Sequence, residues 1–318
     1  MLTVSETVAL LRTFDNVLIL THIRPDGDTV GCAAALCAGL RALGKTAYLL
    51  PNPGLTDRIA PYFQPYAAPT GFVPDKVIST DIATVGLFPE NAMPYAQRVD
   101  LAIDHHPSFE AFGKANIVRP EAAACGELVY DILATLGSIT PEIALPLYLA
   151  ISTDSGCFVY SNTTPQTHAI AAALLRTGID YQTVNQVFFR TKTRKRLALE
   201  ADMLNHMEFY DRDRVVFLFV PMSLIARLQA TENDAEDLSS LGAQMEGVDC
   251  AVTFRELRPD VWKLSVRTGN RISATNVCRV LGGGGHAAAA GCTVDGSLVE
   301  VKHRILNAIA QNAPDFSE

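Results

Sequence analysis

The sequence predicts an α/β fold in which an N-terminal domain built on a parallel sheet precedes a smaller C-terminal α/β domain with a glycine-rich loop. Short apolar runs alternate with helical patterns in the first half of the chain, as is typical of a parallel sheet. From Arg214 the pattern changes, and the apolar runs indicate the strands of a second sheet. A length of 318 residues, with 48% hydrophobic and 19% charged residues, is sufficient for two cores.

Four strands are predicted for the first sheet, at 16–21, 46–50, 76–79 and 99–103. Helices are predicted over 31–43, ending at Gly44, and over 126–136, with Gly137 as the cap. The segment 141–150 fits either a helix or a buried strand, and its initial proline with its Ala and Leu content favours a helix. A further helix is predicted over 167–177.

The boundary between the domains is expected at the basic stretch 190–196, which precedes a helix predicted over 197–207. We therefore expect a catalytic domain over 1–190, a linker helix within 191–211 and a second domain over 212–318. That domain should contain strands at 215–220, 250–255 and 262–267, and a helix over 234–245. The basic stretch is most simply a solvated face, and alternatively it attracts a nucleotide backbone.

Composition and charge narrow the class of protein. No apolar run is long enough to span a membrane, and residues 1–12 do not resemble a signal peptide. The seven cysteines are scattered without a C-x-x-C pair, which indicates reduced thiols and a cytoplasmic protein. A net charge of −8 argues against broad binding of duplex nucleic acid but is compatible with a small anionic substrate.

Acidic residues and histidines follow apolar segments at four places along the chain. These places are His22–Asp28 (HIRPDGD), Asp81, Asp104–His106 and Asp154. Because the carboxyl ends of parallel strands share one edge of a sheet, the four segments can converge there. A single aspartate after a strand is more often a helix N-cap or a turn residue, so the prediction depends on the four segments together.

Convergence would bring together four carboxylates, those of Asp26, Asp28, Asp81 and Asp154. Like charges at such short range raise one another's pKa values unless cations neutralise them. Two divalent ions would do so, and His22 and His105 would add neutral imidazole ligands. Mixed oxygen and nitrogen donors suit manganese, while magnesium, cobalt and zinc remain open. Two such ions can activate water for attack on phosphorus.

A run of glycines, Gly282–Gly285, precedes His286 and four alanines. We interpret this stretch as a loop that leads into a tightly packed helix, and a flexible turn is the simpler alternative. Glycine N–H groups can approach an anion closely, and a helix N-terminus favours negative charge. His286 would then lie where it can donate a hydrogen bond to a phosphate.

Together these motifs resemble the DHH phosphoesterases, whose C-terminal DHH-associated domain carries a GGGGH motif. The resemblance extends over nearly the whole chain. Glu127 in CGELVY and the segments 153–158 and 161–165 are similar to the small bifunctional NrnA-like members, which act as nano-RNases and pAp phosphatases. Cys32 and Cys157 depart from the family pattern and are not expected to be ligands.

The resemblance implies a role for each matching residue. His22, Asp26 and Asp81 would hold one metal ion, Asp28 and His105 would hold the other, and Asp81 and Asp154 would be shared. His106 would contact the scissile phosphate and assist the leaving group, and Asp104 would orient a neighbouring histidine. The other end of the substrate would be held by Gly283, Gly284, Gly285, His286 and Arg267. Residues His168, His206 and His303 fall in helical patterns and are expected at the surface.

The expected activity is hydrolysis of short single-stranded oligoribonucleotides to nucleoside monophosphates, of 3′-phosphoadenosine 5′-phosphate (pAp) to AMP and phosphate, or of both. A phosphodiesterase for linear or cyclic dinucleotides is the close alternative. A non-catalytic nucleotide sensor is a third hypothesis, and it would be expected to lack at least one ligand. An inorganic pyrophosphatase of this type is disfavoured because such enzymes do not use the GGGGH loop. A RecJ-type exonuclease is disfavoured because such enzymes carry additional domains. The family often forms homodimers, a state that these residues do not decide.

Overall fold

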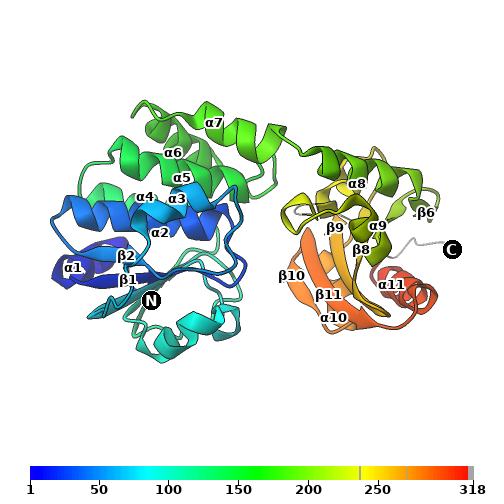
Figure 1. Ribbon diagram of the computed structural model, residues 1–318, viewed down its shortest axis with the longest axis horizontal. Helices are drawn as coiled ribbons and strands as arrows, with labels where there is room; N and C mark the ends of the chain where they lie inside the picture. Colours follow the sequence, from blue (N-terminus) through cyan, green and yellow to red (C-terminus); the bar gives the residue numbers. More distant parts are fainter. Residues whose placement is uncertain (236–237, 270, 314–318) are drawn as a thin grey trace. The chain divides into compact units, whose positions relative to one another are not determined.

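A computed structural model describes residues 1–235, 238–269 and 271–313. The chain forms two compact units, Met1–Thr191 and a second unit from Lys192 onward. Each unit contains one sheet with helices, so the predicted α/β class is confirmed (Figure 1). In the described residues, no helix combines the length and the apolar character that crossing a membrane requires.

The first unit is built on a five-stranded sheet in which every pair of neighbours is parallel. Its strand order is β2-β1-β3-β4-β5. The strands are β1 (Val17–Leu20), β2 (Ala47–Leu49), β3 (Lys76–Thr80), β4 (Leu101–Asp104) and β5 (Ala115–Val118). Four of them were predicted. The sequence reasoning missed the edge strand β5, which has a single buried residue, Ile117, and so gives a weak apolar signal.

The helices of the first unit are α1 (Val4–Thr13), α2 (Gly27–Ala42), α3 (Ala60–Phe63), α4 (Cys125–Leu136), α5 (Pro141–Asp154), α6 (Pro165–Leu175) and α7 (Tyr181–Asn185). The segment 141–150 is helical, as favoured, but the helix continues to Asp154. The predicted start of α2 at Gly31 was wrong, because Asp26 caps the helix and lets it begin at Gly27. Helix α1, which the sequence analysis did not propose, begins with a capping box of Thr3 and Glu6.

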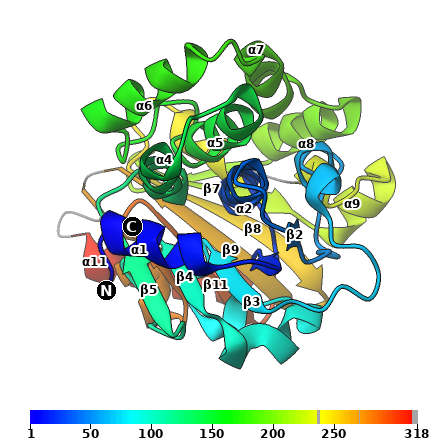
Figure 2. The same ribbon diagram turned by 90° about the vertical axis from the view of Figure 1, so that its left-hand side faces the viewer.

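Alternate residues of the central strands face two different layers. Val17 and Ile19 of β1 belong to the core beneath α2, α4 and α5, whereas Leu18 and Leu20 pack on the opposite side against the segment around the 3-10 helix Glu90–Arg98. Figure 2 shows α2 and α4 side by side on one face of the strands, with α5 and α6 beyond them. Burial on both faces explains why these strands read as continuous apolar runs.

Glycines allow α2, α4 and α5 to approach one another closely. A Cβ added to Gly27 would lie 2.2 Å from Thr153 Oγ1, and one on Gly31 would lie 2.3 Å from the carbonyl oxygen of Pro146. A Cβ on Gly126 of α4 would lie 2.8 Å from Ala150 Cβ. This packing brings the first turns of α2 and α4 next to the last turn of α5.

The second unit contains a six-stranded sheet in the order β10-β11-β9-β8-β7-β6. The strands are β6 (Glu208–Tyr210), β7 (Val215–Val220), β8 (Cys250–Arg258), β9 (Val261–Thr268), β10 (Gly284–His286) and β11 (Ala289–Asp295). Helices α8 (Arg194–Asn205) and α9 (Met222–Leu228) pack on one face. Helices α10 (Ala274–Val280) and α11 (Leu298–Asn312) pack on the other.

The helix predicted over 234–245 was wrong. The structure has short 3-10 turns at Asn233–Ala235, Leu238–Ser240 and Gly242–Gln244, and residues 236–237 lie outside the described part. The carboxylate of Asp234 accepts hydrogen bonds from the backbone N–H and the hydroxyl of Thr231, which hold the first of these turns. A Cβ on Gly242 would lie 2.6 Å from Leu218 Cδ1, so the chain lies close against the sheet there.

The helix expected after the glycine run was also wrong. Gly284–His286 forms β10, which pairs in antiparallel fashion with β11, and the alanines lie in the connecting turn and in β11. A Cβ on Gly283 would lie 2.2 Å from the carbonyl oxygen of Gly291, and one on Gly285 would lie 2.6 Å from that of Ala289. These two glycines are therefore required by the close approach of two strands, and no helix N-terminus follows them.

The packing of α2 on α5 predicts that Gly31→Ala destabilises the protein. The new methyl group would meet a backbone oxygen at 2.3 Å, and this overpacking should cost about 1–3 kcal/mol, more than the gain in helix propensity. The melting temperature of the metal-free protein should fall by several degrees. The control is Gly137→Ala, at an extended position with open space around it. Equal stability of the two variants would contradict the packing argument.

Candidate metal centre

The central strands of the first unit end beside one another and supply three segments of the site. His22 follows β1, Asp81 follows β3, and Asp104 ends β4 before His105. The chain runs from β1 outward to β2 and then returns to β3 on the other side of β1, so β1 and β3 flank the topological switch point. Asp81 has φ of 58°, and its N–H donates to the carbonyl of Ile103 at 2.9 Å. Aspartate is one of the few residue types that tolerate this left-handed conformation.

The loop after β1 supplies two carboxylates in different environments. Asp26 is the N-cap of α2, and its Oδ1 accepts hydrogen bonds from the N–H groups of Asp28 and Thr29 at 3.0 and 3.1 Å. Its side chain is 55% exposed. Asp28 lies in the first turn of α2 and is only 1% exposed. Asp26 therefore caps α2, the ordinary role of an aspartate at this position, and also lies beside His22.

The N-terminus of α4 holds the buried carboxylate of Asp28. The N–H groups of Cys125 and Gly126 donate to its two oxygens at 2.7 and 3.0 Å, and the thiol of Cys32 donates at 3.2 Å. The N-cap residue of α4, Ala124, has no side-chain oxygen to offer. Asp28 therefore satisfies N–H groups that a helix leaves open at its start, and the helix dipole favours its negative charge.

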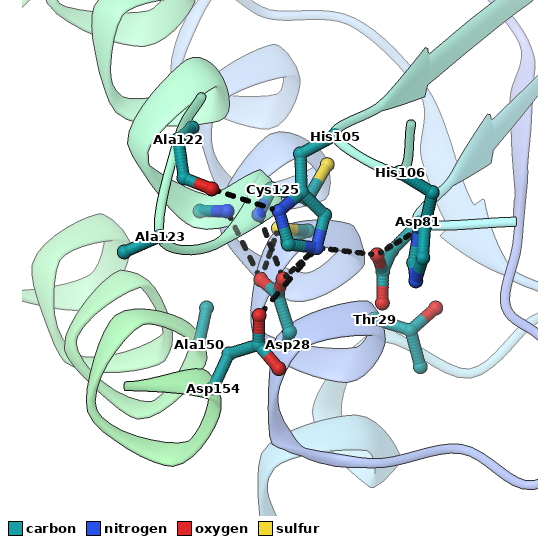
Figure 3. Close-up of polar contacts among 12 residues, drawn as sticks. Asp28, Thr29, Asp81, His105, His106, Ala122, Ala123, Cys125, Ala150 and Asp154 are labelled. Atoms are coloured by element: carbon teal, nitrogen blue, oxygen red, sulfur yellow. Dashed lines mark hydrogen bonds and ion pairs between the residues drawn. The ribbon is translucent and has the colours of Figure 1, made fainter. Parts of the chain in front are cut away.

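His105 lies at the centre of the cluster (Figure 3). Its Nε2 is 3.5 Å from Asp81 Oδ1, 3.5 Å from Asp154 Oδ2 and 3.7 Å from Asp28 Oδ2. Its Nδ1 lies 3.1 Å from the carbonyl oxygen of Ala122. A carbonyl can only accept, so Nδ1 carries the proton and Nε2 presents its lone pair to the carboxylates, as in a metal-binding histidine. Asp154 is the last residue of α5 rather than the end of a strand.

His22 forms the other side of the cluster. Its Nε2 is 3.6 Å from Asp26 Oδ1 and 3.8 Å from Asp81 Oδ2. Among the described residues, three sets of side chains place ligand atoms within 4.8 Å of one another, and they overlap at Asp81 and His105. The sets are His22–Asp26–Asp81, Asp28–His105–Asp154 and Asp81–His105–His106. The structure thus brings together all six residues that the sequence analysis selected as metal ligands.

The donor set fits divalent cations. Distances of 3.5–3.8 Å are too long for hydrogen bonds between these groups, yet a small ion fits between atoms so arranged. Oδ1 of Asp81 is buried, and within the described part of the chain it has no hydrogen-bond partner. Buried carboxylate oxygens are normally satisfied, so this atom is better explained as a ligand than as a structural acceptor.

Asp28, Asp81 and Asp154 have raised pKa values, whereas the pKa of Asp26 is lowered to about 2, because the interaction with His22 and the hydrogen bonds from Thr29 and Asp28 outweigh burial. Burial and the nearby charge of Asp26 raise the pKa of Asp28 to about 7, and burial and the charge of Asp28 raise the pKa of Asp154 to about 7. Burial, followed by the charges of Asp28 and Asp26, raises the pKa of Asp81 well above its ordinary value. The cluster therefore lacks positive charge that bound cations would supply.

Asp104 and His106 form a hydrogen-bonded pair at the edge of the cluster. Asp104 is fully buried, and its Oδ1 accepts from the backbone N–H of His106 at 2.6 Å and lies 2.8 Å from His106 Nδ1. Burial opposes the charged form of His106, but the hydrogen bond to Asp104 and its charge raise the pKa of the imidazole. The pair can hold an oriented, protonated histidine.

The remaining predicted site residues lie in the second unit. Arg267 on β9 pairs with Ala289 on β11, which in turn pairs with His286 on β10. Directly paired residues point to the same face of a sheet, so Arg267 and His286 lie in one row with only a methyl group between them. Gly283 precedes β10, and Gly284 and Gly285 are part of it. His168, His206 and His303 are exposed, as predicted.

Sequence reasoning missed the backbone that surrounds the cluster. The carbonyl of Ala122 and the N–H groups of Cys125 and Gly126 contact His105 and Asp28, although no motif marks backbone groups. It also assigned no role to Asn162, whose amide donates to the carbonyls of Ala123 and Asp154. The segment around Asn162 had been singled out only as a likeness to a family.

Two family models match the chain. The model described as "DHH family, N-terminal domain" covers residues 16–151, and that described as "DHHA1 domain" covers residues 214–313. The first range includes five of the six candidate ligands; Asp154 follows three residues after its end. The second includes Arg267 and the glycine run.

Relatives of known name match over nearly the full length. The chain is 32% identical over 299 residues to a "Bifunctional oligoribonuclease and PAP phosphatase NrnA" from Thermus thermophilus, covering 93% of this chain and 89% of the relative. A protein of the same name from Mycoplasma genitalium is 26% identical, with 92% of each chain covered. The crystal structure of an exopolyphosphatase-related protein from Bacteroides fragilis superposes with a TM-score of 0.85 at 22% identity, over 97% of this chain and 95% of that one.

The raised pKa values predict how pH affects the metal-free protein. The folded-state pKa of about 7 for Asp28 and Asp154 lies above the ordinary value of 3.8, so the folded state binds more protons than the unfolded state between these values. The protonated forms of Asp28 and Asp154 therefore stabilise the folded state at low pH, and this stabilisation is lost as pH rises from about 4 through 7. Bound divalent ions replace the protons, so the increase in melting temperature that Mn²⁺ causes should grow from pH 5.5 to pH 8.

Thermal unfolding with and without Mn²⁺ at four pH values checks this prediction. The control is Asp260→Asn, which changes an exposed aspartate outside the cluster and should leave the pH dependence intact. Asp28→Asn should flatten it. A metal-induced increase that stays constant or shrinks with rising pH would contradict the assignment.

Proposed function

The chain belongs to the DHH family, and from this premise we propose that it is a two-metal phosphoesterase acting on short oligoribonucleotides and on pAp. It would release nucleoside monophosphates from the former and convert the latter to AMP and phosphate. The observation that carries the proposal is the set of overlapping ligand groups around Asp81 and His105. The names of the full-length relatives support the same substrate class.

Two divalent ions would be held by the two ligand groups that share no residue. His22, Asp26 and Asp81 would hold one, and Asp28, His105 and Asp154 would hold the other, with Asp81 near both. When bound, such ions polarise a phosphoryl oxygen and lower the pKa of water. The mixture of carboxylate and imidazole donors favours manganese among the candidates.

The protein's own contribution to the reaction begins with His106. Asp104 fixes the orientation of its ring through Nδ1 and stabilises the imidazolium. Nδ1 of His106 is also 3.5 Å from Asp81 Oδ1, so the ring lies at the edge of the ligand cluster. A protonated histidine there would donate to a phosphoryl oxygen of the substrate and stabilise the charge that develops as water attacks phosphorus and the ester bond breaks.

The second unit would contribute donors that bind a phosphate group of the substrate. Arg267 and His286 offer two donors in one row, and guanidinium groups bind phosphate in bidentate fashion. Strand β10 is the last in the order of this sheet, so its glycines lie at an edge that a substrate can approach closely. Anion recognition here would depend on side-chain donors and strand N–H groups, in place of the helix N-terminus predicted from the sequence.

Two features favour this function over its alternatives. Each proposed ligand position holds a residue able to bind a metal, whereas a non-catalytic sensor would be expected to have lost one. The relatives that match over 89% or more of their own length carry the name of an oligoribonuclease and PAP phosphatase, and this favours that activity over a dinucleotide phosphodiesterase.

The first functional prediction concerns substrate choice and Asp81. Purified protein with Mn²⁺ should hydrolyse di- to pentaribonucleotides and pAp, and should leave pyrophosphate largely intact. Asp81→Asn keeps a residue that tolerates the left-handed backbone but removes the charge between the two ligand groups. Loss of such a central ligand should reduce kcat/KM on both substrates by at least about 100-fold, in line with losses of several kcal/mol of charge stabilisation.

The matched control is again Asp260→Asn, which should keep wild-type rates. Release of products is followed by ion-exchange chromatography for RNA and by phosphate release for pAp. Hydrolysis of pyrophosphate alone would overturn the substrate assignment and keep the metal centre. Tight binding of nucleotide without turnover of any substrate would instead indicate the sensor.

The second prediction separates His106 from the metal ligands. His106→Gln should lower kcat by about 10²–10⁴-fold, the range expected for loss of a positioned proton donor, while the affinity for Mn²⁺ changes little. Asp104→Asn should lower kcat less, because the histidine remains but loses its fixed orientation. Mn²⁺ titration by calorimetry together with steady-state kinetics tests both statements. A large loss of metal affinity in His106→Gln would reassign this residue as a ligand.

A further inference from the structure

One short segment, 122–126, contacts two members of the ligand group Asp28–His105–Asp154. The carbonyl of Ala122 lies 3.1 Å from His105 Nδ1, and the N–H groups of Cys125 and Gly126 donate to Asp28 at 2.7 and 3.0 Å. Figure 3 shows Ala122, in the turn that precedes α4, directed at His105, and Cys125, the first residue of α4, beside Asp28. Two of the three ligands are therefore held directly by the segment 122–126.

Asn162 connects the third ligand to the same segment. Its side-chain amide donates to the carbonyl of Ala123 at 2.9 Å and to the carbonyl of Asp154 at 3.1 Å. Both acceptors are backbone carbonyls, so the two N–H groups of one amide join them. Asp154 is the last residue of α5, and the last carbonyls of a helix have no N–H partner within the helix. The Asn162 amide supplies such a partner to the carbonyl of Asp154.

The chain between Asp154 and Asn162 has an unusual backbone. Gly156, Cys157 and Phe158 follow one another with φ of 57°, 57° and 68°. Left-handed conformation costs non-glycine residues about 1–2 kcal/mol each, so it persists only where the surroundings hold it. Here the N–H of Cys157 donates to the carbonyl of Ser152 at 2.7 Å, and the N–H of Phe158 donates to Ser155 Oγ at 3.1 Å. The turn reverses the chain and returns Asn162 to the end of α5.

We propose that Asn162 is a positioning residue that fixes Asp154 relative to Asp28 and His105 and thereby sets the affinity of this group for its metal ion. The inference deepens the proposed function and rests on its two-metal centre. The strained turn serves to bring the amide to Asp154, and the segment 122–126 is the common support of all three ligands.

The other ligand group has a different support. His22 and Asp26 lie on the loop after β1, and Asp26 is held by the N–H groups of Asp28 and Thr29. The two hydrogen bonds of the Asn162 side chain go to Ala123 and Asp154 and to neither member of that loop. Loss of the amide should therefore weaken one ion and spare the other, which a general loss of stability would not do.

The test is titration of the metal-free protein with Mn²⁺, followed by calorimetry and by the electron paramagnetic resonance signal of the free ion. Wild type should bind two ions. Asn162→Ala and Asn162→Leu, the latter similar in volume but unable to donate, should weaken one ion about 10–100-fold, as is usual for loss of a residue that orients a ligand. The other ion should change by less than about twofold. Ser161→Ala, at the exposed neighbouring position, is the matched control and should behave as wild type.

Kinetics supply a second readout. The Mn²⁺ concentration for half-maximal rate should rise about tenfold or more in the Asn162 variants, while kcat at saturating Mn²⁺ recovers to near the wild-type value. Equal weakening of both ions, unchanged affinity for both, or a single ion bound by wild type would overturn the inference. A third outcome separates the two proposals. If wild type binds two ions and the variants bind one of them more weakly, but neither RNA nor pAp is hydrolysed, the proposed function fails and the role of Asn162 stands.

Discussion

The repulsion among buried carboxylates is the constraint on which the first unit depends. Asp28 and Asp81 are almost inaccessible to water, and Asp154 lies within reach of the same histidine. Burial and mutual repulsion raise all three pKa values, so at neutral pH the cluster is costly without added positive charge. A fold that keeps these groups together must therefore hold them rigidly when no cation is present and must gain free energy when cations bind.

The chain meets this constraint mainly with backbone groups. Two N–H groups at the start of α4 donate to the carboxylate of Asp28, and a carbonyl fixes the tautomer of His105. The left-handed backbone of Asp81, directly after β3, orients its own side chain. Close packing of α2, α4 and α5 at glycines keeps these backbone groups in register with α5. Because side-chain entropy plays little part in such contacts, the ligand atoms can be held without a large ordering cost.

The sequence reveals the ligands better than it reveals their support. Apolar strands that run into Asp or His mark His22, Asp81 and His105, and the sharing of one edge by parallel strands implies that they meet. Asp154 shows the limit of this argument, because it reaches the cluster from the end of a segment for which the periodicity did not decide between helix and strand. The contacts of Ala122, Ala123 and Cys125 leave no trace in residue type, since any residue offers the same carbonyl and N–H. Asn162 has a distinctive side chain, but its partners are backbone atoms eight and thirty-nine positions away.

The glycine run shows how a correct motif can support a wrong local structure. Glycine next to alanine predicts a loop and a packed helix, yet alanine and glycine together also suit two strands that approach closely. What decides between them is pairing with β9, through which β11 continues the sheet from Ala289 to Asp295. This long-range pairing overrides the local helix preference of alanine. The consequence is chemical as well as topological. A helix N-terminus would have favoured any anion, whereas a row containing Arg267 and His286 beside an edge strand can discriminate by the geometry of its donors.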